Sequence, residues 1–253
     1  MVRTFNLYIA FLILSISAAH AQTEIEFFLR GNGHYEMGEY EDAVKNYRSL
    51  LDSGYESSEL WYNLGNAYYK LGRIGYSVLS YERAKKLEPS DESILYNLSA
   101  ASLLVKDKII PPPENFLIEG LRNLRDSHKT DSLISILITL YISSIVIYSL
   151  TLFMPKGRLI RMSHYALFLI GLIFFSVSIM TGIKIEHELN NIRAVVMVQE
   201  MSVSSAPEEI GEELFILHEG TRVEIIGGSQ EWAQIRLSDG KAGWVPTEMI
   251  EVI

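Results

Sequence analysis

The amino-acid sequence predicts a multidomain membrane protein with an all-α domain, two transmembrane helices and an all-β domain. Three patterns support this prediction. Two long runs without a charged residue divide the chain, the residues before them repeat with a period of 34, and the residues after them alternate between apolar and polar side chains. These patterns are typical of membrane helices, helical repeats and β-strands, respectively.

The two uncharged runs are residues 133–153 and 165–183. A helix rises 1.5 Å per residue, so each run can cross a hydrocarbon core of about 30 Å. The alternative is a buried helix of a soluble domain, but such long helices normally keep a polar face. We therefore predict that both runs are transmembrane helices.

Residues 1–21 have the features of a secretory signal peptide. Arg3 is basic, an apolar stretch follows, and Ala19–Ala21 ends in the small-residue pattern of a cleavage site. Export of the following residues places the loop at 154–164 in the cytoplasm. That loop contains basic residues and no carboxylate, as the positive-inside rule requires.

Residues 22–108 carry an internal repeat. Residues 61–67 (WYNLGNA) and 95–101 (LYNLSAA) share four of seven positions at an offset of 34. This period, built on helix–turn–helix units, is the signature of tetratricopeptide repeats. The unit from Trp61 to Pro89 closely resembles that family, which implies an all-α tetratricopeptide-repeat domain.

The resemblance implies two repeats, at about residues 24–56 and 58–91, and a capping helix at about 92–106. In this family the first helix of each unit lines a concave groove that binds a partner. The side chains expected in the groove are Asn32, Tyr35, Tyr62, Asn66, Tyr69, Lys70 and Asn97. The alternative role for these residues is packing between neighbouring repeats.

Residues 109–132 are predicted to form a Pro-rich linker and an amphipathic helix. Pro111–Pro113 favours a stiff polyproline conformation. Leu117, Leu121 and Leu124 then share one helical face, with arginines elsewhere. The helix lies either on the membrane surface, with its arginines on lipid phosphates, or against the repeats.

Residues 193–253 change to short alternating segments separated by turns. Asp239-Gly240 between two of them predicts a two-residue hairpin. Residues 219–250 closely resemble bacterial SH3-like domains, which implies an all-β SH3-like barrel. Trp232 and Trp244 are core or barrel-edge residues in one interpretation and ligand contacts in the other.

The sequence contains no pattern for catalysis or for a cofactor. It has no cysteine, its six histidines are scattered without metal-ligand spacing, and it lacks a nucleophile motif and a phosphate-binding glycine loop. Its net charge of −9 at pH 7 argues against a nucleic-acid partner. We expect a non-enzymatic protein that holds no metal and no cofactor.

The order of these parts resembles that of the BatE family of the Bacteroides-type aerotolerance operon. The resemblance implies a bacterial inner-membrane protein with both soluble domains in the periplasm. It implies as partners other Bat proteins of the envelope, including von Willebrand A-domain proteins, and a link to oxidative-stress tolerance. The resulting hypothesis is a scaffold that binds proteins through its repeat groove. The alternative is a cell-wall module that binds peptidoglycan through the SH3-like domain.

Overall fold

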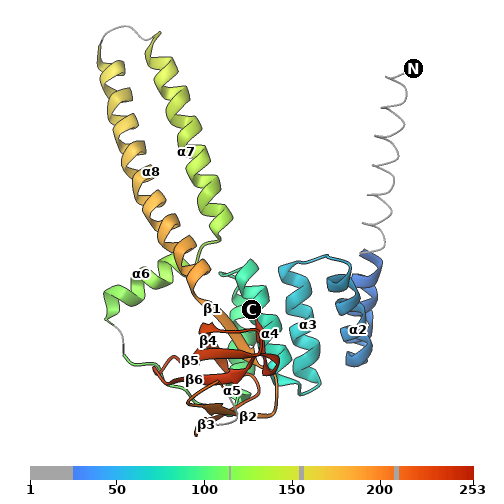
Figure 1. The fold of residues 1–253 in the computed structure, drawn as a ribbon. Helices are drawn as coiled ribbons and strands as arrows, with labels where there is room; N and C mark the ends of the chain where they lie inside the picture. The colour runs from blue at the N-terminus through green and yellow to red at the C-terminus, as the bar shows by residue number, and fades with distance from the viewer. Residues whose placement is uncertain (1–24, 114, 154–156, 208–210) are drawn as a thin grey trace, which may run out of the picture.

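The computed structural model describes residues 25–113, 115–153, 157–207 and 211–253. The expected signal peptide lies outside these residues, and so does part of the expected cytoplasmic loop. Figure 1 shows a stack of helices, a long helical hairpin and a sheet, in that order along the chain.

The helical stack extends from residue 25 to Leu104. Its members are the helical residues 25–36, α2 (Tyr40–Asp52), α3 (Ser58–Lys70), α4 (Ile74–Leu87) and α5 (Glu92–Leu104). The Ser57 side chain accepts a hydrogen bond from the Leu60 amide, and Asp91 accepts from the amides of Ser93 and Ile94. These caps satisfy amide groups that the first helical turn leaves unpaired.

One contact recurs in both helix pairs at the 34-residue spacing. Gly31 packs on the ring of Tyr47, and Gly65 packs on the ring of Tyr81. A Cβ at Gly31 would lie 2.5 Å from a ring carbon, and one at Gly65 would lie 2.7 Å away. Both tyrosines are fully buried. The sequence period therefore reflects a close approach of two helices that a larger residue would push apart.

The residues after the hairpin form one seven-stranded antiparallel sheet in the order β3-β2-β6-β5-β4-β1-β7. Val203, Ile235 and Val245 are fully buried in its core. The strands are β1 (Ile192–Val196), β2 (Glu200–Ser204), β3 (Glu213–His218), β4 (Arg222–Gly228), β5 (Trp232–Arg236), β6 (Ala242–Pro246) and β7 (Ile250–Val252).

The predicted two-residue hairpin at Asp239-Gly240 is wrong in its length. The Leu237 amide donates to the Lys241 carbonyl, and the Gly240 amide donates to the Leu237 carbonyl at 3.0 Å. The loop between β5 and β6 thus has three residues, a turn followed by Gly240 at φ +92°. Glycine adopts that left-handed conformation without steric cost, which is why this loop type ends in glycine.

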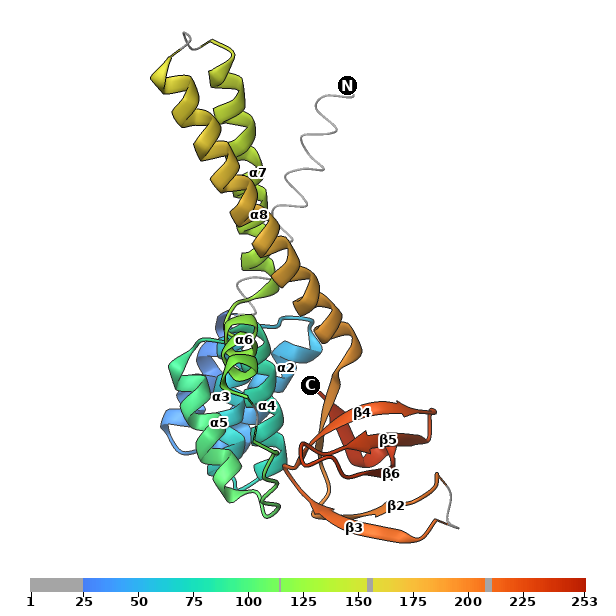
Figure 2. The ribbon, with the colours of Figure 1, turned by 90° about the vertical axis from the view of Figure 1, so that its left-hand side faces the viewer.

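Strand β1 is buried on both of its faces. Ala194, Val195 and Val196 all have no exposed surface. Ala194 and Val196 belong to the core of the sheet, whereas Val195 packs into the helical stack with Val78 and Leu98. Successive side chains of a strand point to opposite faces, so β1 lies between two hydrophobic cores. Figure 2 shows α8 running into this strand beside α4.

Polar contacts surround this apolar junction. Glu219, in the turn after β3, accepts a hydrogen bond from the Gly75 amide in the first turn of α4 at 2.8 Å. Asp107, after α5, accepts from the His218 amide at 2.7 Å and from the Thr221 hydroxyl at 2.6 Å. Burial alone would raise the pKa of Asp107, but these hydrogen bonds outweigh it and lower that pKa.

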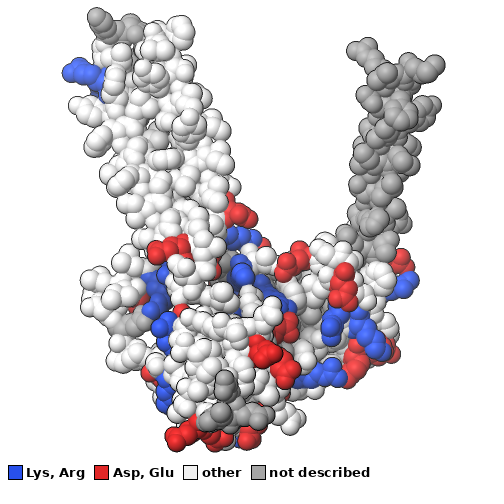
Figure 3. Space-filling view, in the orientation of Figure 1, with Lys and Arg blue, Asp and Glu red and all other residues white. Residues whose placement is uncertain are grey.

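The long hairpin consists of α7 (Thr130–Thr151) and α8 (Arg158–Asn190), both long and apolar enough to cross a membrane. Apolar side chains such as Tyr141 (59% exposed) and Phe168 (74%) lie on its surface, and Figure 3 shows that surface almost without charge. Residues 158–164, expected in a loop, are helical. They contain neither glycine nor proline, so the helix begins directly after Gly157.

Helix α6 (Phe116–Asp126) precedes the hairpin and keeps its apolar face exposed. Leu117 is 60% exposed, Leu121 69% and Leu124 51%. At the base of the hairpin, Lys184 of α8 donates to the Arg125 carbonyl at 3.3 Å. Thr130 of α7 donates to Glu188 of α8 at 2.9 Å. The two ends of the hairpin therefore meet next to α6.

We predict that Val195→Asp separates the helical stack from the sheet. A carboxylate at this fully buried position has no partner, so the free energy of unfolding should fall by about 3 kcal/mol or more. Thermal unfolding of the full-length protein in detergent, followed by tryptophan fluorescence, measures the loss. Val252→Asp is the control, because Val252 is 48% exposed on the neighbouring strand. Equal melting of the two variants would contradict a core built around Val195.

Candidate functional site

A cavity of about 310 Å³ opens on the face of the helical stack formed by residues 25–36, α3 and α5. Its walls contain five of the seven expected groove residues: Tyr35, Asn66, Tyr69, Lys70 and Asn97. Tyr81, Tyr96 and Ala100 complete the lining. The other two expected residues, Asn32 and Tyr62, do not line this cavity and belong to the hydrogen-bond network described next.

An amide network links each helix pair to the next. The Asn66 Oδ1 atom accepts from the Tyr81 hydroxyl at 2.6 Å and from Asn97 Nδ2 at 2.9 Å. One repeat earlier, Asn32 Oδ1 accepts from the Tyr47 hydroxyl at 2.7 Å and from Asn63 Nδ2 at 3.2 Å. Asn32 and Asn66 thus each bond to a tyrosine of their own repeat and to an asparagine of the next helical unit.

Tyr62 also belongs to this network, because its hydroxyl accepts from Asn97 Nδ2 at 2.9 Å. Its ring lies 6.0 Å from that of Tyr81, measured between centroids. Asn97 therefore bonds to two side chains of the preceding repeat while it also lines the cavity. The capping helix α5 is held in place by the same residue types that join full repeats.

The side chains that remain available to a ligand are aromatic and cationic. Tyr96 is 74% exposed and Lys70 is exposed, while Tyr35 and Tyr69 are half-buried. Burial raises the pKa of the Tyr35 phenol, so this hydroxyl stays protonated and can donate a hydrogen bond. Lys70 carries the sole charge among the residues that line the cavity. The cavity is suited to an apolar or aromatic group next to a negative charge.

Sequence reasoning missed Tyr96, although a signal for it existed. Tyr96 lies 34 residues after Tyr62, so the repeat period assigns both to the same helical position. Tyr62 is half-buried and contacts Asn97 of the capping helix α5, whereas α5 ends the stack and leaves Tyr96 uncovered. The repeat period thus identifies the helical position of Tyr96. Tyr96 is exposed because α5 is the last helix of the stack.

Within the described residues, His34, Glu39 and Asp42 place potential metal-ligand atoms within 4.8 Å of one another. His34 Nδ1 lies 2.6 Å from Glu39 Oε2, and Lys45 donates to Asp42 at 2.7 Å. Their polar atoms thus have partners within the chain, and we assign no metal to this cluster.

Comparison with known proteins identifies the helical stack. Residues 28–92 match the tetratricopeptide-repeat family model. Protein bimA of Emericella nidulans is 29% identical over 69 residues, which cover 27% of this chain and 9% of that protein. The matched segment therefore spans less than a tenth of bimA. The helical stack contains tetratricopeptide repeats, as the 34-residue period predicts. Such repeats are typical non-enzymatic scaffolds for protein–protein interaction.

Among solved structures, one match is the first tetratricopeptide-repeat domain of Spaghetti (RPAP3), bound to the HSP90 peptide SRMEEVD. It shares 19% sequence identity with this chain at a TM-score of 0.31. The match covers 42% of this chain and 76% of that structure.

We predict that Asn66→Ala destabilises the repeats even though Asn66 lines the cavity. The substitution removes the acceptor for both Tyr81 and Asn97, which should cost about 1–3 kcal/mol. Chemical denaturation of the full-length protein, followed by circular dichroism, measures the change. The control is Lys70→Ala. Lys70 lines the same cavity but is exposed, so this substitution should change the free energy of unfolding by less than about 0.5 kcal/mol. Similar stabilities for the two variants would refute the structural role of Asn66.

Proposed function

We propose that this protein is a membrane-anchored, non-enzymatic scaffold that binds a segment of a partner protein in the groove of its repeats. The observation that carries the proposal is the open cavity lined by Tyr35, Tyr69, Lys70 and Tyr96. The sheet packs against α4 through Val195 and leaves the opposite face of the stack uncovered. The groove is thus accessible to a partner.

Membrane anchoring by α7 and α8 is the second part of the proposal. The exposed apolar surface of the hairpin supports it, since no described segment covers that surface and lipid would. The two ends of the hairpin meet through Thr130 and Glu188. That contact supports placing the repeats and the sheet on the same side of the membrane. We assign that side to the periplasm and the membrane to the bacterial inner membrane.

The lining of the groove indicates the chemistry of the partner segment. Lys70 attracts a carboxylate, and the tyrosine rings offer flat surfaces for an apolar or aromatic side chain. An acidic segment with one large apolar residue fits both features. We propose that Bat-type envelope proteins with von Willebrand A domains supply this segment, within a complex that serves oxidative-stress tolerance. This identification follows the resemblance to the BatE family.

The sheet supports a second candidate function, peptidoglycan binding by an SH3-like domain. Trp232 and Gln234 share one face of β5, and Trp244 pairs directly with Gln234. Both tryptophans are half-buried on this face, while Ala233 and Ile235 point into the core. The register therefore favours the outer surface of the sheet for both indole rings. Aromatic side chains on an open sheet face are suited to contacts with the faces of sugar rings.

The groove proposal predicts that Tyr96→Ala weakens partner capture about tenfold, because an exposed aromatic residue is a typical anchor of protein interfaces. In the assay, immobilised full-length protein in mild detergent is incubated with envelope extracts. Quantitative mass spectrometry then measures the yield of captured von Willebrand A-domain proteins. Tyr55→Ala is the matched control, since Tyr55 is exposed outside the groove. If both variants capture as much as the unmodified protein, the groove is not the binding site. Sedimentation with purified peptidoglycan, lost on Trp244→Ala, would then favour the second function.

A further inference from the structure

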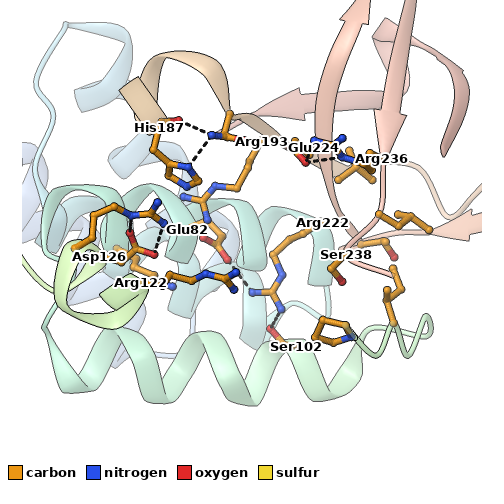
Figure 4. Close-up of a pocket in the computed structure, with 18 of the residues that line it drawn as sticks. Glu82, Ser102, Arg122, Asp126, His187, Arg193, Arg222, Glu224, Arg236 and Ser238 are labelled. Carbon is orange, nitrogen blue, oxygen red and sulfur yellow. Dashed lines mark hydrogen bonds and ion pairs between the residues drawn. The ribbon is translucent and has the colours of Figure 1, made fainter. Parts of the chain in front are cut away.

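A second and larger cavity, of about 1010 Å³, lies where the repeats, α6, the base of α8 and the sheet meet. It is separate from the repeat groove, and the two cavities have no lining residue in common. Figure 4 shows Glu82, Arg122, Arg193 and Arg222 gathered there from α4, α6, β1 and β4. Because these segments lie far apart in the sequence, the cavity forms only when the chain is fully folded.

Among the charged residues in the walls of this cavity, basic residues outnumber acidic ones. The basic residues are Lys85, Arg122, Arg125, Arg193, Arg222 and Arg236, and the acidic residues are Glu82, Asp107, Asp126 and Glu224. Arg222 pairs with Glu82 at 2.8 Å, Arg125 with Asp126 at 2.7 Å and Arg236 with Glu224 at 3.0 Å. For Lys85 and Arg193, no ion pair with a carboxylate occurs among the described residues. These two cations are suited to an anionic group of a ligand.

Glu82 provides a contrasting feature in the same cavity. Glu82 is 2% exposed, and its Oε1 atom accepts a hydrogen bond from Arg222. Its Oε2 atom is buried and has no hydrogen-bond partner. A buried carboxylate oxygen without a donor is costly, and native proteins satisfy such atoms with another group, a water molecule or a ligand. A ligand that complements this site therefore carries a hydrogen-bond donor, and a positively charged one complements it best.

The wall of the cavity that lies toward the hairpin is largely apolar. Ile118, Leu121 and Leu124 of α6 line the cavity together with Met180 and Ile183 of α8. The α6 residues are more than half exposed, and Ile183 is 52% exposed. The cavity is therefore continuous with the apolar surface that we assign to the membrane. A ligand that fills it has a charged end in the cavity and an apolar end along α6 and α8.

We propose that this cavity binds the headgroup of a phospholipid with a primary amine, of the phosphatidylethanolamine class. Lys85 and Arg193 hold its phosphate, the ammonium group donates to Glu82 Oε2, and the acyl chains lie along α6 and α8. A headgroup without an amine leaves Glu82 Oε2 unsatisfied, and a quaternary ammonium has no N–H to donate. This inference rests on the proposed membrane anchoring, because the acyl chains need a bilayer beside α8.

The test compares lipids bound to the full-length protein in nanodiscs, detected by native mass spectrometry. Phosphatidylethanolamine, phosphatidylcholine and phosphatidylglycerol with identical acyl chains are the probes. We expect phosphatidylethanolamine to bind about tenfold more tightly than phosphatidylcholine, the factor that one hydrogen bond between charged groups contributes. Glu82→Gln should abolish this preference. Lys85→Gln and Arg193→Gln should weaken the binding of all three lipids. Lys45→Gln lies outside the cavity and should leave the binding of each lipid unchanged.

Equal affinity for phosphatidylethanolamine and phosphatidylcholine overturns the proposal, and so does tighter binding of phosphatidylglycerol. Equally tight binding of soluble glycerophosphoethanolamine overturns the role of the acyl chains. If Glu82→Gln does not fold, the lipid comparison with unmodified protein and the two basic-residue variants still decides the question. Extraction of membranes with alkaline carbonate tests the anchoring separately. A protein that stays in the membrane without a lipid preference leaves the proposed scaffold intact and rejects the lipid site.

Discussion

The burial of β1 on both faces is the constraint on which the rest of this structure depends. Val195 completes the core of the repeats, while Ala194 and Val196 complete the core of the sheet. Because β1 follows α8 almost directly, the long apolar hairpin, the repeats and the sheet are joined at a single strand. Glu219, in the turn between β3 and β4, also accepts a hydrogen bond from the Gly75 amide in the first turn of α4. Each soluble part thus contributes surface that the other needs to exclude water.

This junction explains both candidate sites. Since the sheet occupies the α4 side of the stack, the groove on the other side stays open and has a fixed direction relative to the hairpin. A partner bound at Lys70 and Tyr96 would be held at a defined distance and angle relative to the hairpin. The same packing leaves an unfilled space between α6, α8 and β4, which is the basic cavity. A lipid held there would couple the orientation of both domains to the membrane surface.

Local patterns predict the helical repeats well, because each contact recurs at a spacing visible in the sequence. Gly31 against Tyr47 and Gly65 against Tyr81 are an example, and five of the seven expected groove residues line one cavity. The junction is less predictable. Ala194-Val195-Val196 is a continuous apolar run, typical of a strand buried on both faces, but nothing local identifies what covers Val195. The basic cavity combines residues from seven separate helices and strands, so no spacing along the chain reveals it.

The central claim is that the repeats and the sheet form one rigid unit. Because the sequence contains no cysteine, two cysteines can be introduced for spin labelling without first replacing native ones. Labels on cysteines at the exposed positions Asp52 and Gln230 report the distance between the two parts by pulsed electron paramagnetic resonance in detergent and in nanodiscs. A rigid unit predicts a single narrow distance distribution that is the same in both environments. A broad distribution, or one that shifts between the two environments, would contradict the claim.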